Sequence, residues 1–401
     1  MVSEHASPLA ALGGADGGGQ NVQVAELAKG LARLGHQVVV HTRRDDPQLP
    51  TEVAFADGAR VQHVTAGPAR PLPKDELLPH MPAFGRRLAE KWTADPPDLV
   101  HAHFWMSGLA ARRGVAGLGV PLVQTFHALG AVKRRHQGGK DTSPPERIPS
   151  EITLGREADL VVATCSDEVE ELAAMGVPRE RTAIVPCGTD LTSFTPEGPC
   201  APRGARLRVL SVGRMVERKG IDTAIAAVAR LRRVELVVAG GPPAEQWQDD
   251  PEAVRLRALA ADLGVADRVR FLGPVPHEQV PALHRSADLV VSAPWYEPFG
   301  TVPLEAMACA VPPVVTAVGG HLDTVVDGET GVLVPPRDPD ALAGGMRRLL
   351  EQPFRRAAIG RAGSERVRAR YGWDRLAREV ATAYRRARLP RTTELTAEAA
   401  S

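Results

Sequence analysis

The sequence predicts an α/β fold of two Rossmann-like domains, with parallel sheets that face an interdomain cleft. Three observations support this. Nine short, continuously apolar runs alternate with amphipathic stretches, which is typical of parallel strands covered by helices on both faces. The chain has 401 residues, more than one ordinary core accommodates. The alternation breaks once, over residues 187–206, in a segment rich in Pro, Gly, Ser and Thr.

Residues 1–190 are predicted to form the N-terminal domain. The opening "MVSEHASPLA" contains at most half a strand, so we expect either a very short first strand or a start codon upstream. A helix is expected over 21–35, because its apolar residues recur at helical spacing and Gly35 can end it. Strands are expected at the apolar runs 36–42, 97–103, 120–126 and 158–165.

Residues 205–372 are predicted to form the second domain. Its strands are expected at 207–213, 234–241, 267–273, 287–294 and 312–318. Residues 373–390 read as a basic amphipathic helix that crosses back to the N-terminal domain, followed by a tail that frays. Because doubly wound sheets bind ligands beyond the carboxyl ends of their strands, the cleft between the domains is the expected ligand site.

Composition excludes several classes of protein. The 49 basic and 48 acidic side chains nearly cancel, so no nucleic acid partner is implied. The four cysteines have neither disulfide-framework nor zinc spacing, which favours a reducing cytoplasm. No apolar run approaches the ~18 residues of a membrane span, and no export signal is recognised, although a peripheral membrane contact stays open.

Two glycine-rich or basic turns are candidate phosphate sites. "GGADGGGQN" (13–21) leads into the first helix, whose free amides favour an anion; Gly19 would contact the donor and Asn21 the acceptor. Its spacing is not G-x-G-x-x-G, and the next strand ends in two arginines, which disfavours a dehydrogenase. In "SVGRMVERKG" (211–220), Arg214 and Lys219 suit a diphosphate. A flexible turn and a solvated basic loop are the respective alternatives.

The stretch "EPFGTVPLE" (297–305) carries two glutamates. Pro and Gly keep Glu297 in a loop after a strand, and Glu305 falls about one turn into a helix. The free amides of Phe299, Gly300 and Thr301 would surround an anion. The spacing alone does not exclude a glycosidase pair. The neighbouring cations favour a phosphate-bearing ligand, whose hydroxyl groups the carboxylates would accept.

Histidines follow two strands of the first domain. His101, His103 and His127 make a weak metal triad because no acid lies near them in the sequence, so no metal site is expected. A single His127 beside a reacting sugar is the favoured interpretation. The pattern Asp338-Pro339-Asp340 is read as a helix N-cap and not as a metal motif.

A second cluster of cations is predicted on the first domain. Lys133 begins a basic run, and with Lys74 and Arg147 it could supply an anion pocket for a second substrate. A solvated face is the alternative interpretation of the run.

Together these segments resemble retaining glycosyltransferases of family 4, which have the GT-B architecture. The most specific block is "EPFGTVPLEAMACAVPPVVTAVGG" with the later "DGETGVLV". The resemblance implies that Arg214 and Lys219 bind a donor diphosphate and stabilise the leaving group in place of a metal. It further implies that Glu305 accepts from the ribose, that Glu297 accepts from the donor sugar, and that the 299–301 amides support sugar or phosphate oxygens. His127 would contact the sugar near its anomeric centre, and the departing phosphate would take the acceptor proton.

Within the family, "GGQN", "PKDELLPHMPAF", "HAHFWMSG", "HALGAVKRRH" and "PPERIPSE" are most similar to inositol-phosphate N-acetylglucosaminyltransferases and sucrose-phosphate synthases. In the former branch, residues matching Lys74 and Arg147 grip the acceptor phosphate. Phe104 and Ala128 depart from the pattern by replacing two hydroxyl-bearing residues. This loss of two donors argues against inositol phosphate itself and leaves an anionic or cyclitol-like acceptor.

The expected function is therefore a retaining, metal-independent and cofactor-free transferase. It would move a glucose- or N-acetylglucosamine-type sugar from a UDP-linked donor to a small hydroxylated, phosphorylated or cyclitol acceptor. A nucleotide-sugar epimerase or hydrolase, and a non-catalytic sugar-binding protein, are the alternatives. Arg214 and Lys219 disfavour the last, because a simple sugar binder needs no diphosphate clamp. The sequence leaves monomer and homodimer both open.

Overall fold

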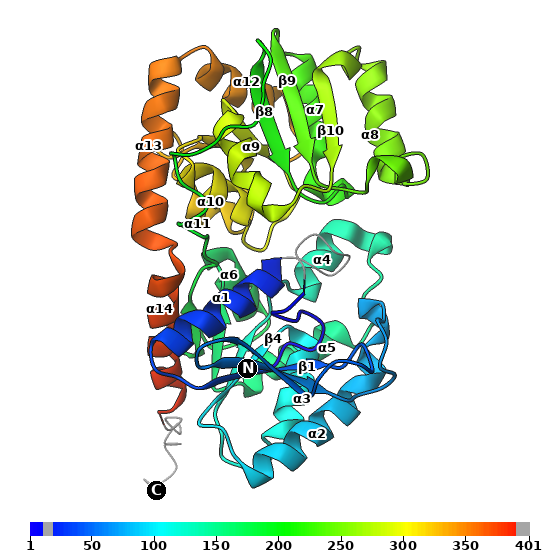
Figure 1. The fold of residues 1–401 in the computed structure, drawn as a ribbon, viewed down its shortest axis with the longest axis vertical. Helices are drawn as coiled ribbons and strands as arrows, with labels where there is room; N and C mark the ends of the chain where they lie inside the picture. The colour runs from blue at the N-terminus through cyan, green and yellow to red at the C-terminus, as the bar shows by residue number, and fades with distance from the viewer. Residues whose placement is uncertain (11–18, 390–401) are drawn as a thin grey trace, which may run out of the picture.

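The computed structural model describes residues 1–10 and 19–389, which form two α/β domains stacked along the long axis of the molecule (Figure 1). The strands of the N-terminal domain are β1 (Val38–Arg43), β2 (Glu52–Ala56), β3 (Ala59–Val64), β4 (Val100–His103), β5 (Leu122–Thr125), β6 (Leu160–Ala163) and β7 (Thr182–Ile184). Its helices are α1 (Gly19–Arg33), α2 (Met81–Ala94), α3 (Trp105–Gly114), α4 (Gly130–Gln137), α5 (Arg147–Glu157) and α6 (Ser166–Ala174). The four strands expected in this half of the chain are all present.

The extreme N-terminus joins two groups of strands. Val2 bridges in parallel to both His41 of β1 and Ala102 of β4, and its amide donates to the carbonyl oxygen of His101 at 2.9 Å. These contacts connect the order β2-β3-β1 to the order β4-β5-β6-β7. Val2 therefore lies at the centre of the domain, between β1 and β4.

Three strands of the structure were not predicted in the N-terminal half. β2 and β3 form a hairpin around Gly58, and β2 pairs antiparallel to β3, which corrects the expectation of purely parallel sheets. The side chains of β2 are half-buried or exposed, because β2 is the outer strand, so it lacks the continuous apolar run of a covered strand. β7 has three residues, too few for a periodic signal.

The C-terminal domain contains one parallel sheet in the order β10-β9-β8-β11-β12-β13. Its strands are β8 (Leu207–Val212), β9 (Val234–Ala239), β10 (Val269–Gly273), β11 (Leu289–Ser292), β12 (Pro313–Thr316) and β13 (Val332–Val334). The five expected strands are confirmed, and the three-residue β13 is additional. Its helices are α7 (Ile221–Ala229), α8 (Pro251–Asp262), α9 (Val280–Ser286), α10 (Thr301–Ala308), α11 (His321–Thr324), α12 (Pro339–Leu350) and α13 (Pro353–Arg370).

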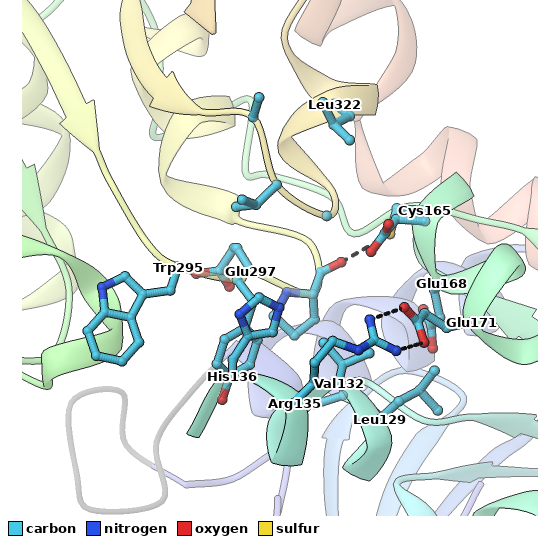
Figure 2. Close-up of a pocket in the computed structure, with 17 residues that line it drawn as sticks. Leu129, Val132, Arg135, His136, Cys165, Glu168, Glu171, Trp295, Glu297 and Leu322 are labelled. Carbon is cyan, nitrogen blue, oxygen red and sulfur yellow. Dashed lines mark hydrogen bonds and ion pairs between the residues drawn. The ribbon is translucent and has the colours of Figure 1, made fainter. Parts of the chain in front are cut away.

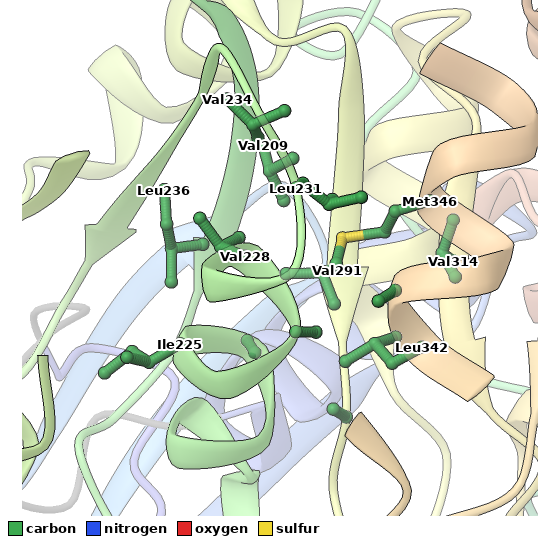
Figure 3. Packing of buried hydrophobic residues seen from close by; sticks show 14 of the residues in the cluster. Val209, Ile225, Val228, Leu231, Val234, Leu236, Val291, Val314, Leu342 and Met346 are labelled. Carbon is green, nitrogen blue, oxygen red and sulfur yellow. The ribbon is translucent and has the colours of Figure 1, made fainter. Parts of the chain in front are cut away.

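One side of this sheet is covered by α7 and α12. Ile225 and Val228 of α7, with Leu342 and Met346 of α12, pack against the β8, β11 and β12 valines (Figure 3). Strand order reverses at β8, since β9 lies on one side of it and β11 on the other. The loops after β8 and β11 therefore emerge side by side, at the position where doubly wound sheets bind ligands.

The chain crosses between the domains at two adjacent places. The segment between β7 and β8 contains no described helix or strand, as the composition of residues 187–206 predicted. Its Thr189 amide donates to the Tyr371 carbonyl at 3.0 Å, where α13 ends. Beyond Gly372, α14 (Trp373–Ala387) lies along α1 of the N-terminal domain (Figure 1). Gly30 of α1 allows this close approach, because a Cβ there would lie 2.7 Å from the Ala377 Cβ.

Three further features bear on what the sequence predicted. The described helices include none that is long and apolar enough to cross a membrane. All four cysteines are free thiols, and three of them are buried. Asp338 caps α12 as expected, since its carboxylate accepts from the Asp340 and Ala341 amides at 3.0 and 2.9 Å.

Hydrogen bonds connect α14 to the strands that lead to the cleft. The Thr125 hydroxyl donates to the Val162 carbonyl at 3.0 Å, so toward His101 Nε2, 2.9 Å away, it acts as acceptor. His101 Nε2 therefore carries the proton, and its Nδ1 accepts from the Tyr384 hydroxyl at 2.8 Å. Burial raises the pKa of Tyr384, so this hydroxyl remains a donor.

We expect Tyr384→Phe to destabilise the protein by about 1–2 kcal/mol, because it leaves buried His101 Nδ1 without a donor. The thermal midpoint should fall while the far-UV circular dichroism stays unchanged. Thr382→Ala, at an exposed position of the same helix, is the matched control and should change the stability by no more than about 0.5 kcal/mol. Equal midpoints for the two variants would contradict the assigned direction of these bonds.

Candidate active site between the two domains

The carboxyl ends of β4 and β5 form one wall of the candidate site. His103 and Thr125 are partners in the two strands, and Phe104 and His127 follow them. Phe104 has φ of 80° and His127 has φ of 61°, values that side chains other than glycine rarely adopt. Backbone strain of this kind concentrates where surrounding structure holds a functional side chain in place.

The His127 ring contacts a second histidine. His127 Nε2 lies 3.0 Å from Nδ1 of the fully buried His103. Burial lowers the pKa of His127 to about 3, and the nearby His5 and Lys74 add to this effect. Burial also lowers the pKa of His103 well below its usual range. Both rings are therefore neutral near pH 7.

A cavity of about 380 Å³, here called the cationic cavity, opens between the domains. The Lys74 ammonium lies 3.6 Å from the ring centroid of Phe104, and the Arg147 guanidinium lies 5.2 Å from it. The described residues that line this cavity include Lys74, Lys133, Arg147, Arg214 and Arg218, and among those residues the only carboxylate is Asp75. The predicted acceptor cations and the donor cation Arg214 thus meet in one cavity with strong preference for an anion.

Two of these cations are held by buried carboxylates. Arg147 Nε donates to Glu151 at 2.8 Å, and its Nη2 donates to the Ala128 carbonyl at 2.7 Å. Lys133 Nζ lies 2.9 Å from Asp141, and although burial raises the pKa of Asp141, hydrogen bonds and the Lys133 charge lower it to about 2. These partners fix the positions of the cations before any ligand arrives.

Glu297 lies in the loop after β11 and is nearly buried. Its carboxylate pairs with the Lys219 ammonium, and Arg218 Nη1 is 3.9 Å away. Burial raises the pKa of Glu297, but Lys219 and Arg218 outweigh this and lower it to about 2. Burial lowers the pKa of Lys219 more than Glu297 raises it. Two residues 78 positions apart in the sequence are thus brought into one ion pair.

Two glycines permit this arrangement because other backbone comes too close for a side chain. Gly220, at φ of 65°, follows Lys219, and a Cβ there would lie 1.9 Å from the Ala293 carbonyl oxygen. Gly319 has φ of 47°, and a Cβ added there would lie 2.0 Å from the Glu297 carbonyl oxygen. The turns that carry the pair are therefore packed directly against their neighbours.

The start of α10 presents free backbone donors. Gly300 precedes the helix with φ of 80°, and among the described residues no acceptor is recorded for the amides of Phe299, Gly300 or Thr301. The Phe299 ring itself is buried in the core. Glu305 lies in the second turn, 3.5 Å from His284 Nε2. Free amides and a partly exposed carboxylate together suit a ligand with both anionic and hydroxyl groups.

Another cavity, of about 830 Å³, brings Thr301 and Glu305 together with Gly19 and Asn21. Asn21 is buried and donates to the Ser7 carbonyl at 3.1 Å. It does not line the cationic cavity with Lys74, Lys133 and Arg147. The preceding part of the predicted glycine-rich turn, residues 13–18, lies outside the described residues.

The domains contact each other around the loop that carries Glu297. The His136 ring stacks on Tyr296 with centroids 5.0 Å apart, and Gln137 Nε2 donates to the Tyr296 hydroxyl at 2.5 Å. The Cys165 thiol donates to the Pro298 carbonyl at 3.2 Å. A cavity of about 230 Å³ lies beside these contacts, and Glu297 of one domain and His136 of the other both line it (Figure 2).

Sequence reasoning missed three contributors to this site: Arg218, Tyr296 and the positioning contact of His103. Arg218 precedes Lys219 in the same basic turn. The sequence shows its charge, but not that its side chain points toward Glu297. Tyr296 precedes Glu297, and only the folded contact with α4 shows its part in joining the domains. The bond between His103 and His127 depends on strand register, which no local pattern reveals.

The three histidines considered as a metal triad make other contacts. His101 uses both ring nitrogens in bonds to Tyr384 and Thr125, and His103 bonds to His127. Within residues 1–10 and 19–389, no group of three or more His, Cys, Asp or Glu side chains could hold a metal ion.

Two family descriptions match the two halves of the chain. Residues 17–193 match "Glycosyltransferase Family 4", and residues 201–366 match "Glycosyl transferases group 1". The D-inositol 3-phosphate glycosyltransferase of Acidothermus cellulolyticus is 38% identical over 100% of this chain and 93% of its own length.

Two solved structures have the same fold as this chain. A sucrose-phosphate synthase from Thermosynechococcus elongatus has a TM-score of 0.86 and 33% identity, covering 96% of this chain and 97% of its own. Anabaena Alr3699/HepE, solved with UDP and glucose, has a TM-score of 0.72 at 20% identity over 96% of this chain and 98% of its own, and shows the same fold.

Removing Lys219 should lower the free energy of unfolding, because the nearly buried Glu297 carboxylate loses its ammonium partner. We expect Lys219→Met to lower the stability at pH 7 by about 1–3 kcal/mol, with Arg218 as the remaining partner. The folded pKa of Glu297, about 2, is below its ordinary value of 4.5, so the stabilisation is present above pH 4.5 and is lost as pH falls toward 2. Thermal midpoints measured across this range should therefore converge with wild type at the acid end.

The double variant Lys219→Met/Glu297→Gln provides the control, because it removes both charges. It should be more stable than Lys219→Met alone at pH 7. Additive effects of the two substitutions would show that the pair contributes nothing to the fold.

Proposed function

Because this chain belongs to the family 4 glycosyltransferases of GT-B architecture, we propose that its interdomain cleft transfers a sugar from a UDP-linked donor to a small anionic acceptor. The sugar is of glucose or N-acetylglucosamine type, and transfer retains the anomeric configuration without a metal ion. The observation that carries this proposal is the ion pair of Lys219 and Glu297 at the switch point of the C-terminal sheet, close enough to Arg214 for its charge to lower the pKa of Lys219.

The donor would lie along the loops after β8 and β11. Arg214 and Lys219 would bind the diphosphate and stabilise the negative charge that develops on the leaving group. Glu297 would accept hydrogen bonds from the sugar, and Glu305 from the ribose. The amides of residues 299–301, for which no acceptor lies among the described residues, would support the sugar or phosphate oxygens.

The acceptor would occupy the cationic cavity. The names of two relatives contain a phosphorylated polyhydroxy compound: D-inositol 3-phosphate in one, and sucrose phosphate, the product of a synthase, in the other. Lys74, Lys133 and Arg147 supply positive charge there, which supports a phosphorylated cyclitol or sugar phosphate as acceptor. Phe104 offers the acceptor an apolar ring and no hydroxyl group. Asn21, in the separate cavity beside Gly19, would act nearer the donor than its predicted acceptor role implies.

The division of labour follows the two domains. We assign acceptor binding to residues 1–190 and donor binding to residues 205–372, and the helix over 373–390 to the N-terminal unit because α14 packs on α1. Four free thiols support a reducing, cytoplasmic setting. A monomer is sufficient for this site, since both walls come from one chain, and a homodimer is compatible with it.

The direct test incubates the protein with UDP-glucose or UDP-N-acetylglucosamine, with and without D-inositol 3-phosphate or a hexose phosphate. A donor at 100 times its Kd should stabilise the fold by about 2.7 kcal/mol, and UDP release should depend on acceptor. Equal UDP release without acceptor would instead support a hydrolase, and stabilisation without turnover would support a sugar-binding protein.

We expect Arg214→Ala and Lys219→Ala each to lower kcat by about 10²-fold or more, because each removes a donor to the leaving group. Initial rates are measured below the melting temperature of every variant, so that the stability effect of Lys219 does not enter. Arg230→Ala, at an exposed ion pair immediately after α7, is the matched control and should keep its rate. Near-normal rates for both site variants would overturn the diphosphate assignment.

Lys74→Ala should raise the acceptor KM by about tenfold to a hundredfold, through loss of a charged hydrogen bond to the acceptor anion. Slow donor hydrolysis without acceptor should be unaffected. The exposed Arg87→Ala on α2 serves as control. An unchanged acceptor KM in the Lys74 variant would contradict the proposal that the acceptor anion binds in the cationic cavity.

A further inference from the structure

The bond between His103 and His127 determines which nitrogen of His127 is turned toward His103. The two rings meet through His103 Nδ1 and His127 Nε2 at 3.0 Å, so one nitrogen donates and the other accepts. His103 Nε2 is buried and has no partner among the described residues. The Nε2 edge of His127 faces His103. The exposed part of this half-buried ring is therefore not its Nε2 edge.

Two tautomeric arrangements satisfy the bond. If His127 Nε2 donates, His103 Nδ1 must be bare, and the His103 proton then sits on Nε2 as a buried N–H without an acceptor. If His103 Nδ1 donates, His103 Nε2 is only an unused lone pair. Buried N–H groups without an acceptor are rarer in native structures than unused acceptors, so the second arrangement is the favoured one.

Protonation of either ring does not change this choice. Burial lowers the pKa of both histidines, that of His127 to about 3, so neither is an imidazolium at neutral pH. The His103 ring is also confined sterically: it is fully buried, with its centroid 4.1 Å from that of His101 and 5.2 Å from that of His127. The ring therefore cannot flip by 180°, and Nδ1 remains the His103 nitrogen that faces His127.

We propose that His103 is a positioning residue that donates from Nδ1 to His127 Nε2, so that His127 offers its Nδ1–H as a hydrogen-bond donor to an oxygen of the transferred sugar. This inference rests on the proposed transferase function for the identity of that oxygen. The tautomer itself rests only on the hydrogen bonds of the ligand-free protein. No covalent bond to His127 forms or breaks.

The consequence is a restriction on mechanism. A ring nitrogen that already carries a proton cannot accept one, so His127 orients the sugar and does not act as base toward the acceptor hydroxyl. The acceptor proton must leave by another route, for which the departing phosphate is available. The positive φ of His127 is consistent with this role, because it directs the ring back toward β4.

Nitrogen-15 NMR of the ligand-free protein tests the tautomer without any assay of transfer. With ¹⁵N-labelled histidine, the His127 signals, assigned by their loss in His127→Asn, should show a protonated Nδ1 and a bare Nε2. A protonated Nε2 on His127 would overturn the proposal, whatever the protein catalyses.

Two substitutions of His103 test its effect on turnover. The amide nitrogen of Asn can replace Nδ1–H, so His103→Asn should retain the His127 tautomer and keep kcat within about threefold of wild type, while His103→Leu should lower kcat by about tenfold or more. The KM for donor should change little in either. Similar kcat values for the two variants would refute the positioning role.

The NMR and kinetic experiments distinguish failure of the proposed function from failure of the tautomer proposal. If no nucleotide sugar is turned over by wild type, the proposed function fails, and NMR on wild type still decides the tautomer. If His103→Leu does not fold, wild type and His103→Asn still decide the proposal, because both must show the bare His127 Nε2.

Discussion

The ion pair between Lys219 and Glu297 is the constraint on which the cleft depends. It exists because strand order reverses at β8, which puts the loops after β8 and β11 side by side although 78 residues separate the two side chains. Glycines at 220 and 319 allow these loops to pack without intervening side chains. The resulting charges are nearly buried, so each requires the other, and the pairing orders the C-terminal wall of the cleft before a ligand is present.

The opposite wall is ordered by hydrogen bonds rather than by charge. Val2 joins β1 to β4, and the ends of β4 and β5 hold Phe104 and His127 at positive φ. Behind them, the bonds of His101 extend to Tyr384 of α14. Helix α14, which follows the interdomain crossing at Gly372, therefore supports the wall formed by β4 and β5 of the N-terminal domain.

Sequence alone predicted the strands with continuous apolar runs, because burial on both faces leaves a strong local signal. It missed β2, an outer strand that is half exposed, and its partner β3, whose buried residues alternate with half-buried ones. It also missed β7 and β13, which are too short for periodicity. For the site, residue chemistry and turn position identified Arg214, Lys219 and Glu297 as ligand-binding candidates. Which of these pair with each other, and that His103 contacts His127, depend on strand order and register, which are set by packing between distant segments.

The state of the cations suggests where binding energy is used. Arg147 and Lys133 are held by Glu151 and Asp141 within one domain, so a ligand finds them fixed and need not reorganise them. Lys219 is different, because its partner Glu297 is itself a proposed contact of the donor sugar. A donor bound as proposed would draw Lys219 toward the diphosphate and supply Glu297 with sugar hydroxyls in exchange. That exchange would become more favourable as negative charge accumulates on the leaving phosphate, which is the condition for stabilising the transition state more than the bound substrate.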